Sequence, residues 1–231
     1  MKLKHNENYF KKSDNLKAIG LGMAIVGFLM LWIRLHWLTY MLSPVALIAG
    51  LVMFFIGSAG RSSEADVDEY IKRETMGIEV DFMGDRYYEK RLLKHISPII
   101  AEGYEYSDGL MFKKAKNGSV RSSVYTKAVI YVLSDRLYVS ERHVDIVGGN
   151  TAKNIVEMKY DDIANICITR EEKRVSFGKS SYNVKLCGMA VTDNDGGVWM
   201  APINDDIDSE KTVEKIKEAM LEYKKARAEG S

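Results

Sequence analysis

Two long apolar runs stand in the N-terminal quarter of the chain. The first covers residues 18–33 and the second residues 44–60, and the only formal charge in residues 18–60 is Arg34. Neither run has the polar face that a helix on the surface of a soluble protein shows. Their length is near the lower limit for a helix that crosses a hydrocarbon core of roughly 30 Å. The pattern predicts a transmembrane helical hairpin over residues 18–60.

Basic residues precede the first run. Residues 1–17 form a tail with five lysines, whereas the connection between the runs carries only Arg34. Since lysine and arginine in short flanking segments stay on the cytoplasmic side, we expect both termini in the cytoplasm and two spans in the inner, or plasma, membrane. Trp32, Trp37 and Tyr40 are expected to anchor the hairpin at the membrane interface together with Arg34, because amphipathic side chains suit the headgroup layer.

Other structures share this apolar composition. A cleaved signal peptide also begins with a basic tail, but no small-residue cleavage site follows Ile33 and a second apolar run begins at once. A buried helical pair in a soluble protein would show a polar face. Small residues spaced by four, Gly20 with Ala24 and Ala46 with Gly50, favour close packing within the hairpin over a dimer interface. A homo-oligomer stays open as an alternative.

Residues 61–103 are predicted to form a helical neck. Ser63 is a suitable N-cap, and acidic residues follow it, which predicts a helix from Glu64. A second helix is predicted from Asp85, because apolar residues recur there at helical spacing before Gly103 ends the pattern. These apolar residues are Tyr88, Leu92, Ile96 and Ile99.

From Tyr104 the period of the apolar positions changes to two. Asn117-Gly118 is a strong hairpin signal, and Ser123–Leu133 alternates apolar and polar residues. The alternation continues between short turns and predicts six or seven antiparallel strands. An amphipathic helix is then predicted from Asp206 to about Ala228. The predicted fold class is α+β: a transmembrane helical hairpin, a helical neck, and an antiparallel β-barrel or sandwich capped by a C-terminal helix.

Two stretches of this region resemble the pleckstrin-homology (PH) superfamily. Ile130–Ser140, which includes Ser134–Leu137, resembles the strand–turn–strand of bacterial PH and GRAM-type domains. Met158–Ile166 is similar to the strand that ends in an Asp-Ile-x-x-Ile step in those domains, and the closing helix after Pro202 also fits. The resemblance covers residues 104–228. It implies a PH-like binding or scaffolding domain without catalytic residues, and it leaves the neck unexplained.

Composition narrows the classes of function. Residues 1–60 hold six basic and two acidic residues, so 27 basic and 30 acidic residues remain beyond them. A mildly acidic domain disfavours nucleic acid as a partner. Cys167 and Cys187 form no CxxC pair, and the four histidines lack zinc spacing, so we predict no metal and no cofactor. No Walker loop, nucleophile elbow or dinucleotide fingerprint occurs, so we predict a protein that is not an enzyme.

The acidic sequence Asp193–Gly196 is interpreted as a hairpin turn. If Gly196 stood at the sixth position of a calcium loop, Val191 and Pro202 would occupy the first and twelfth positions. Those positions require carboxylates. We therefore predict no calcium site here.

The first hairpin carries the one cluster of basic residues with functional promise. In eukaryotic PH domains this hairpin binds phosphoinositide headgroups, so the resemblance implies a lipid- or partner-binding role. Side chains on a hairpin could converge on a phosphate. Lysines also protect an exposed sheet edge, and a protein ligand along such an edge is an equal alternative. The candidate residues are Lys113, Lys114, Lys116, Arg121 and Lys127.

The sequence thus predicts a membrane-anchored cytoplasmic binding or scaffolding module. The expected partners are the lipid bilayer and either a protein in a membrane complex or anionic lipid headgroups at the inner leaflet. An unrecognised membrane-associated enzyme and an accessory subunit of a transporter remain as alternatives. A transporter usually needs charged groups at membrane depth, and neither apolar run contains Asp, Glu or Lys.

Overall fold

The chain divides into two compact units, Met1–Val67 and Asp68–Ser231. Its class is α+β, as predicted, because two apolar helices precede a set of antiparallel sheets. In the computed structural model the described residues are 3–11, 15–33, 37–79, 86–203 and 205–229.

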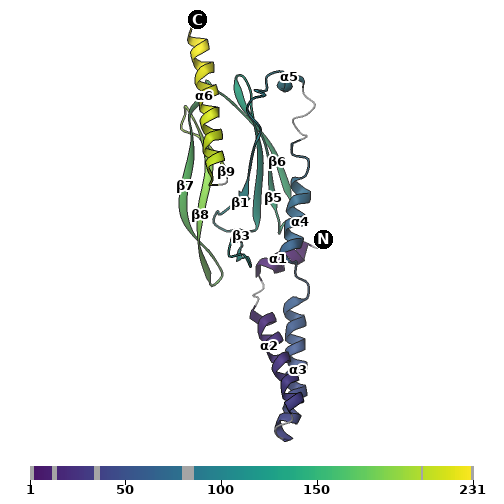
Figure 1. Cartoon of the computed structure of the whole chain (residues 1–231). Coiled ribbons are helices and arrows are strands. Elements are labelled where there is room, and N and C mark those ends of the chain that lie inside the picture. Colours follow the sequence, from purple (N-terminus) through teal and green to yellow (C-terminus); the bar gives the residue numbers. More distant parts are fainter. Residues whose placement is uncertain (1–2, 12–14, 34–36, 80–85, 204, 230–231) are drawn as a thin grey trace. The chain divides into compact units, whose positions relative to one another are not determined.

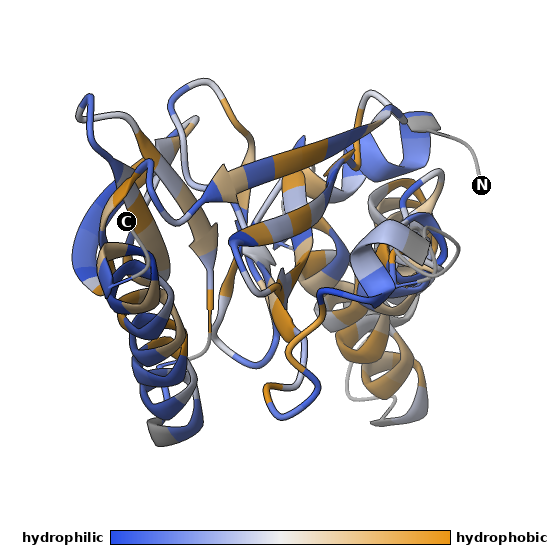
Figure 2. Ribbon diagram, turned by 90° about the horizontal axis from the view of Figure 1, so that it is seen from above, coloured by the Kyte–Doolittle hydropathy of each residue, from blue (hydrophilic) through white to orange (hydrophobic). Residues whose placement is uncertain are grey.

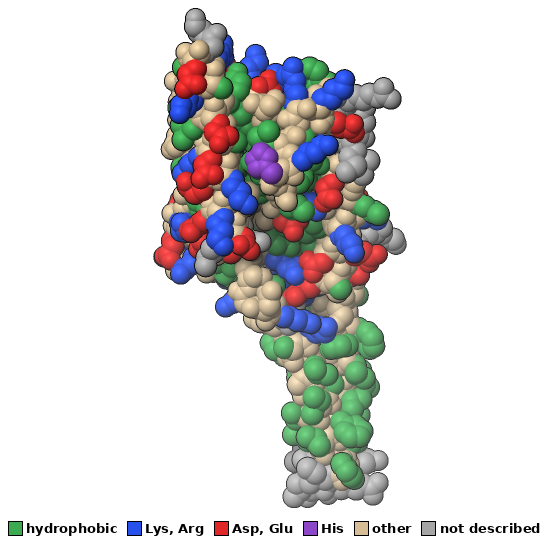
Figure 3. Space-filling model, turned by 45° about the horizontal axis from the view of Figure 1, so that its top comes forward, with side chains coloured by type: hydrophobic (Ala, Val, Ile, Leu, Met, Phe, Trp, Pro, Cys, Tyr) green, Lys and Arg blue, Asp and Glu red, His purple; other side chains and the backbone are tan. Residues whose placement is uncertain are grey.

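The first unit contains helices α1 (Leu3–Lys11), α2 (Asn15–Ile33) and α3 (Trp37–Ser58), and the start of α4 (Glu64–Thr75). By length and composition, α2 and α3 can each cross a membrane. The prediction of two long apolar helices is therefore confirmed. Figure 3 shows hydrophobic side chains covering both helices on the visible face.

Glycines lie where α2 and α3 pack against each other. A Cβ atom on Gly50 would overlap the backbone nitrogen of Ala24, and a Cβ atom on Gly20 would lie 2.5 Å from the nitrogen of Phe54. Small residues let helix backbones come into direct contact. The large apolar side chains point away from this interface, and Phe55 is 63% exposed. The predicted packing within the hairpin thus uses the small residues.

Helix α1, which the sequence did not predict, folds onto the segment after α3. The hydroxyl of Ser62 donates to Asn6 Oδ1 at 2.7 Å, and Asn8 Nδ2 donates to the carbonyl of Gly60 at 2.7 Å. Gly60 has a φ of +66°, a conformation that favours glycine. These bonds fix the chain where it leaves the helical hairpin.

The first predicted neck helix is confirmed and the second is wrong. The amide of Asp66 donates to Ser63 Oγ at 3.2 Å, so Ser63 caps α4. In the second predicted helix only α5 (Arg86–Glu89) is helical, and β1 begins at Ile99. Instead of continuing a helix, the chain forms β1, which pairs with the central strand β4. The helical spacing has another cause: Ile96 packs into the main apolar core of the second unit, whereas Leu92 packs against a separate apolar cluster.

The second unit is built from antiparallel strands (Figure 1). Four of them form the first sheet in the order β1-β4-β5-β6, three form the second in the order β7-β8-β9, and β2 pairs with β3. The described residues give nine strands, more than the six or seven predicted, because β1 lies where a helix was predicted and the short strand β3 stands apart from β4. The sheets do not close into a barrel. The strands are β1 (Ile99–Tyr104), β2 (Phe112–Lys114), β3 (Val120–Ser122), β4 (Val124–Val132), β5 (Arg136–Asp145), β6 (Thr151–Lys159), β7 (Ile163–Phe177), β8 (Ser180–Asp193) and β9 (Val198–Pro202).

The two sheets enclose the main apolar core, and we call this pair of sheets the sandwich. Ile130 and Leu137 of the first sheet are fully buried with Met189 of the second. The predicted final helix is α6 (Ile207–Glu229), and it adds Ile216 to the same core. Its ribbon is mainly hydrophilic with an apolar stripe (Figure 2), as an amphipathic helix on a sheet requires.

The first sheet is buried on its other face as well. Val129, Tyr131 and Tyr138 form a separate cluster with Ile78, and Leu92 packs against it. Residues between α4 and β1 therefore cover the outer face of the sheet. Burial on both faces explains why residues 128–132 of β4 form a continuous apolar run instead of a strict alternation.

Candidate functional site

The predicted basic residues of the first hairpin do not form one cluster. Lys113 and Arg121 lie opposite each other on β2 and β3, and both are at least nine-tenths buried. Lys114 and Lys116 are exposed. Lys127 lies on β4, where its ammonium is 3.6 Å from a carboxylate oxygen of Glu102 on the adjacent strand.

Arg121 is engaged by a carboxylate of α4. Its two terminal nitrogens donate to the two carboxylate oxygens of Asp68, at 2.6 and 3.1 Å. Such a bidentate pair is the geometry in which arginine binds carboxylate or phosphate most strongly. This arginine therefore holds α4 against the hairpin, and a phosphate would have to displace Asp68.

A second buried arginine, Arg142 on β5, holds the other end of α4. Its Nη1 donates to the carbonyl of Glu74 at 3.1 Å and to the carbonyl of Met76 at 2.7 Å. The last carbonyls of a helix lack partners within the helix, and a cation there also opposes the negative end of the helix dipole. Arg142 therefore acts as a C-terminal cap supplied from the sheet.

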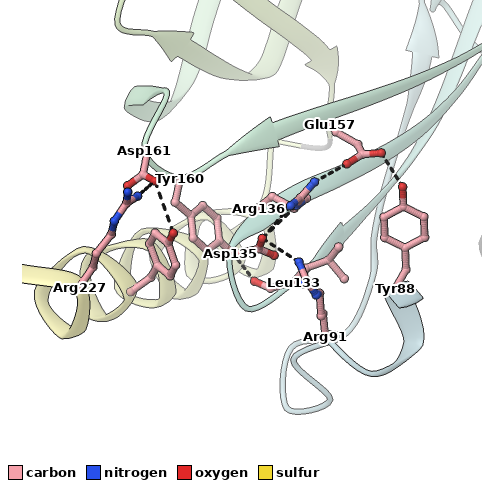
Figure 4. A network of polar contacts seen from close by, with 10 residues as sticks. Tyr88, Arg91, Leu133, Asp135, Arg136, Glu157, Tyr160, Asp161 and Arg227 are labelled. Atoms are coloured by element: carbon pink, nitrogen blue, oxygen red, sulfur yellow. Dashed lines mark hydrogen bonds and ion pairs between the residues drawn. The ribbon is translucent and has the colours of Figure 1, made fainter. Parts of the chain in front are cut away.

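The turn that resembles PH and GRAM-type domains is part of a network of ion pairs (Figure 4). Asp135 accepts from Arg91 at 3.0 Å and from Arg136 at 2.8 Å. Arg136 also donates to Glu157 on β6 at 2.7 Å, and Tyr88 donates to the same carboxylate at 2.5 Å. These bonds tie the turn to β6 and to the segment before β1. The motif residues thus stabilise the fold.

A neighbouring set of contacts holds α6. Tyr160 is fully buried, and its hydroxyl donates to the carbonyl of Leu133 at 2.7 Å. Asp161 is paired with Arg227, and the hydroxyl of Tyr223 lies 3.4 Å from the same carboxylate (Figure 4). The connection between β6 and β7 is therefore fixed to the C-terminal helix.

The sequence did not reveal a polar group of five residues on the inner side of the sandwich, which we call the acid–imidazole cluster. His143 Nδ1 lies 2.8 Å from Glu105 Oε1, and its Nε2 lies 3.4 Å from Glu141 Oε2. The hydroxyl of Thr126 donates to Glu105 and lies 2.9 Å from His143 Nδ1. Trp199 of the second sheet donates its indole N–H to Glu141 Oε1 at 2.7 Å, so the cluster joins the two sheets.

The two carboxylates keep the imidazole protonated. Hydrogen bonds to Glu105 and then Glu141 raise the pKa of His143 to about 10. The bond from His143 lowers the pKa of Glu105. Burial alone would raise the pKa of Glu141, but bonds from His143 and Trp199 outweigh it and lower that pKa. At neutral pH the cluster therefore holds one imidazolium between two carboxylates, and the imidazolium has no lone pair for a metal or a proton.

Two residues of this cluster, Glu141 and His143, could have been predicted from the alternation of inward and outward side chains along β5. Leu137 and Val139 face the main core. Because every second side chain of a strand points to the same face, Glu141 and His143 face inward as well. A charged residue and an imidazole on an inward face are an uncommon signal. Their partners are Glu105, which directly follows β1, and Trp199 of β9. Both lie far from β5 in the sequence, so the sequence could not predict the pairing.

A groove of about 770 Å³ opens between β6 and the β8–β9 turn, and we call it the acidic groove. Its apolar lining includes Met158 of β6 and Trp199 of β9. Four carboxylates line it, and none of its lining residues is basic. The complete lining is Val156, Glu157, Met158, Asp162, Ile163, Val191, Asp193, Asn194, Asp195, Gly197, Val198 and Trp199.

A second hollow of about 560 Å³ lies between the end of β1 and the β7–β8 hairpin. Its lining is mainly apolar and includes Tyr106, Leu186 and Met200, and charges of both signs, among them Glu171 and Lys173, are also part of it. The mixed charges indicate no particular ligand.

No catalytic arrangement stands out among the residues described. No group of three or more His, Cys, Asp or Glu side chains there is placed so that it could hold a metal ion. Burial raises the pKa of the Cys187 thiol, which disfavours the reactive thiolate. Asp193 accepts the amides of Asp195 and Gly197 at 3.0 and 2.6 Å, so the acidic sequence forms the predicted turn.

The predicted membrane-interface residues are described only in part. Trp32 near the end of α2 is 78% exposed. Arg34 lies outside the described residues, and the structure describes only the backbone of Trp37 and Tyr40 in α3. The interfacial role of these four residues stays a prediction.

Comparison with known proteins identifies no relative. No family model matches the chain. No curated protein and no solved structure matches it either. Function is therefore inferred from the geometry of the chain itself.

Proposed function

We propose that the chain is a membrane-anchored cytoplasmic binding module whose PH-like sandwich engages a protein partner. The acidic groove carries this proposal. It is concave, its lining includes large apolar side chains, and it lies beside β6, the last strand of its sheet. Concave apolar surfaces with a few placed polar groups are the usual sites of recognition. The order of a four-stranded and a three-stranded sheet before α6 supports the PH-like assignment.

The anchoring part of the proposal rests on α2 and α3. Their large apolar side chains point outward and leave a hydrophobic surface that only lipid or another apolar partner can cover. The lysines of residues 1–17 support a cytoplasmic location for both termini at the inner membrane. An anchored domain needs no lipid affinity to stay at the membrane, which favours a protein ligand.

Anionic lipid headgroups are the second candidate ligand. Lys114 and Lys116 are exposed in the first hairpin, and exposed cations attract anionic lipid. However, Arg121 is paired with Asp68 and Lys127 with Glu102, so the hairpin offers fewer cations to a phosphate than its sequence suggests. We therefore favour the protein partner.

The test is a purification of the tagged full-length chain from its native membrane in detergent, followed by quantitative mass spectrometry of proteins and lipids. We expect one protein at a fixed ratio. It should remain bound to the double variant Lys114→Glu and Lys116→Glu, and to a control that changes the exposed Lys179 and Lys185 to Glu.

Recovery of the chain without a protein at a fixed ratio would overturn the protein-partner proposal. If anionic lipid instead co-purified with the wild type and the control but was lost from the Lys114 and Lys116 variant, the lipid candidate would replace it. Arg121 is left unchanged in this design because its substitution would also release α4.

A further inference from the structure

Basic residues gather at the end of the helical hairpin where α2 starts and α3 finishes. A Cβ atom on Gly57 would lie 2.9 Å from the backbone nitrogen of Lys17, so these two residues are level with each other. Arg61 follows α3 closely, and α1 supplies two lysines. We call this set the cationic collar. It consists of Lys4, Lys11, Lys17 and Arg61, all of which belong to the unit Met1–Val67.

Helix α1 is held beside the end of α3. In addition to the two side-chain bonds already described, the amide of Ser62 donates to the carbonyl of His5 at 3.1 Å. The guanidinium carbon of Arg61 lies 5.9 Å from the centre of the Tyr9 ring, a distance at which a cation is attracted to an aromatic face. The apolar window of α3 ends at Ser58. Helix α1 therefore lies beside the point where the chain leaves its apolar span.

Helix α1 has a buried side and a charged side. Tyr9 and Phe10 are at most 5% exposed. Lys4 and Lys11 are exposed and lie about two helical turns apart, so they occupy the same side of the helix. Lys11 is paired with Glu7, whereas Lys4 forms no ion pair with any residue that the structure describes. The exposed side of α1 therefore carries a net positive charge.

Lys17 places its charge within the apolar part of the hairpin. Its ammonium is 5.5 Å from the centre of the Phe54 ring, and Phe54 lies one turn before Gly57 in α3. Both Lys17 and Phe54 belong to windows that are apolar enough to cross a membrane. Among the described residues, no carboxylate forms an ion pair with Lys17. A lysine near the end of a spanning helix extends its ammonium to the headgroup layer, where lipid phosphate is the available anion.

The charge of the collar selects the kind of lipid. The described residues up to Arg61 contain four basic residues and one acidic residue, Glu7, which gives a net charge of +3. A zwitterionic headgroup such as phosphatidylcholine carries an ammonium of its own and offers no net charge to the collar. An anionic headgroup such as phosphatidylglycerol offers its phosphate alone, and cations beside a membrane attract it. The collar therefore fits an anionic phospholipid.

We propose that the cationic collar binds the headgroups of anionic phospholipids in the leaflet around it, with Lys17 on a lipid phosphate. The inference rests on the proposed anchoring of the chain by α2 and α3. It goes beyond that function because it gives the anchor a preference for one class of lipid. The site belongs to the first unit and is distinct from the exposed lysines of the first hairpin in the second unit.

The test measures lipid binding to the full-length chain in detergent by native mass spectrometry. The probes are phosphatidylglycerol and phosphatidylcholine with identical acyl chains. We expect a Kd for phosphatidylglycerol that is at least about tenfold lower at low salt, and a smaller difference at high salt, because salt screens exposed charges. Lys4→Gln with Lys17→Gln should raise the Kd of phosphatidylglycerol about tenfold and leave that of phosphatidylcholine unchanged. Equal Kd values of the two lipids for the wild type would overturn the proposal.

Two further variants separate the charge of the collar from its structure. Lys4→Arg with Lys17→Arg keeps both charges and should keep the low Kd of phosphatidylglycerol. Lys179→Gln with Lys185→Gln removes two exposed lysines from the β7–β8 hairpin and should leave this Kd unchanged. The proposal fails if the arginine variant loses phosphatidylglycerol as the glutamine variant does, or if the β7–β8 variant weakens binding equally.

Two other outcomes would assign the lipid or the anion elsewhere. If Lys114→Gln with Lys116→Gln lost phosphatidylglycerol and the collar variant did not, the lipid would lie on the first hairpin and the collar would be ruled out. If soluble glycerol phosphate displaced phosphatidylglycerol at equal concentration, the occupant would be a free phosphate compound, which would also overturn the proposal.

Extraction of the native membrane with alkaline carbonate separates this inference from the proposed function. A chain that is released by carbonate is not anchored by α2 and α3, and the proposed anchoring then fails. A chain that resists carbonate but binds both lipids equally keeps its anchor and loses the collar as a lipid site. The protein partner proposed for the acidic groove takes part in neither measurement.

Discussion

The hairpin of α2 and α3 and the sandwich are packed in opposite ways. In the hairpin, the glycine backbone faces the neighbouring helix and the large apolar side chains face outward. In the sandwich, the large apolar side chains meet between the sheets and the charged side chains face outward. Gly20 and Gly50 stand at the helix contact, whereas Ile130 and Met189 stand in the core of the sandwich. Figure 3 shows the same reversal as a change from green to mixed red and blue.

The difference shows that a different force stabilises each of the two regions. Between helices in lipid, apolar burial adds little, and stability depends on the closeness of backbone packing. In water, burial of apolar side chains dominates, and polar groups need partners wherever they are buried. Added volume should therefore damage the hairpin most, and loss of a polar partner should damage the sandwich most.

The largest effect is expected for Gly50→Leu. A side chain there would overlap the nitrogen of Ala24 and the carbonyl of Gly20, and neither backbone can move without separating the helices. We expect a loss of about 3 kcal/mol in the free energy of unfolding of the hairpin. Unfolding in mixed detergent, followed by circular dichroism, measures it. Gly22→Leu is the matched control, because nothing lies within 4 Å of that position. Equal losses in both variants would refute packing at Gly50 as the cause.

The next effect is expected for Arg142→Ala in the sandwich. The change leaves the carbonyls of Glu74 and Met76 without their donor, and we expect a loss of about 2–3 kcal/mol in unfolding free energy. Urea denaturation measures the loss, and hydrogen exchange should show that α4 opens first. Lys153→Ala is the control, because Lys153 is exposed opposite Arg142 on β6. If α4 keeps its protection in Arg142→Ala, the capping role is wrong.

A smaller effect is expected from the pH dependence of the acid–imidazole cluster. The pKa of His143 is raised to about 10, so its contribution is complete below the ordinary pKa of about 6.5 and is lost as the pH rises through 10. Its side chain is 34% exposed, which reduces the expected loss between pH 7 and pH 10 to about 1–2 kcal/mol. Urea denaturation across this range should show the loss in the wild type and a flatter profile in His143→Gln. Parallel pH profiles of the wild type and His143→Gln would exclude the cluster as the source of the stability loss.

The smallest effect is expected for the pair of Arg121 and Asp68. Asp68 is 55% exposed, so a double-mutant cycle with alanine should give a coupling energy of about 1 kcal/mol. Arg121→Ala alone should cost more than Asp68→Ala, because the arginine is buried and the aspartate is not. A coupling energy near zero would mean that the pair does not hold α4.

Local signals in the sequence predicted local structure. Ser63 and Asp206 were recognisable as helix caps because a cap depends on residues within one turn, and both accept the expected amide. The prediction of a second neck helix was wrong because its regularly spaced apolar residues face two different surfaces, the main core and the outer cluster. The β7–β8 hairpin was partly missed because Arg170–Arg174 carries charge at every position and hides the alternation.

The candidate sites were harder to predict, because their residues come together from distant parts of the sequence. The basic residues of the first hairpin looked alike in the sequence, yet the fold pairs Arg121 with Asp68, which lies 53 residues earlier. The inward position of Glu141 and His143 follows from alternation. Their partners Glu105 and Trp199 do not, because contacts between residues far apart in the sequence are set by the tertiary fold. The acidic groove likewise brings β6 together with the turn that joins β8 to β9 in the second sheet.

The bond between Glu141 and Trp199 has a consequence for synthesis. Trp199 follows Glu141 by 58 residues. At about 5–20 residues per second, roughly 3–12 seconds separate the two on the ribosome. During this interval β6 is added to β1, β4 and β5 of the first sheet, but the indole that joins this sheet to the second has not been made. The nascent domain therefore passes through a stage in which Glu141 on the inner face still lacks the indole of Trp199 as a partner.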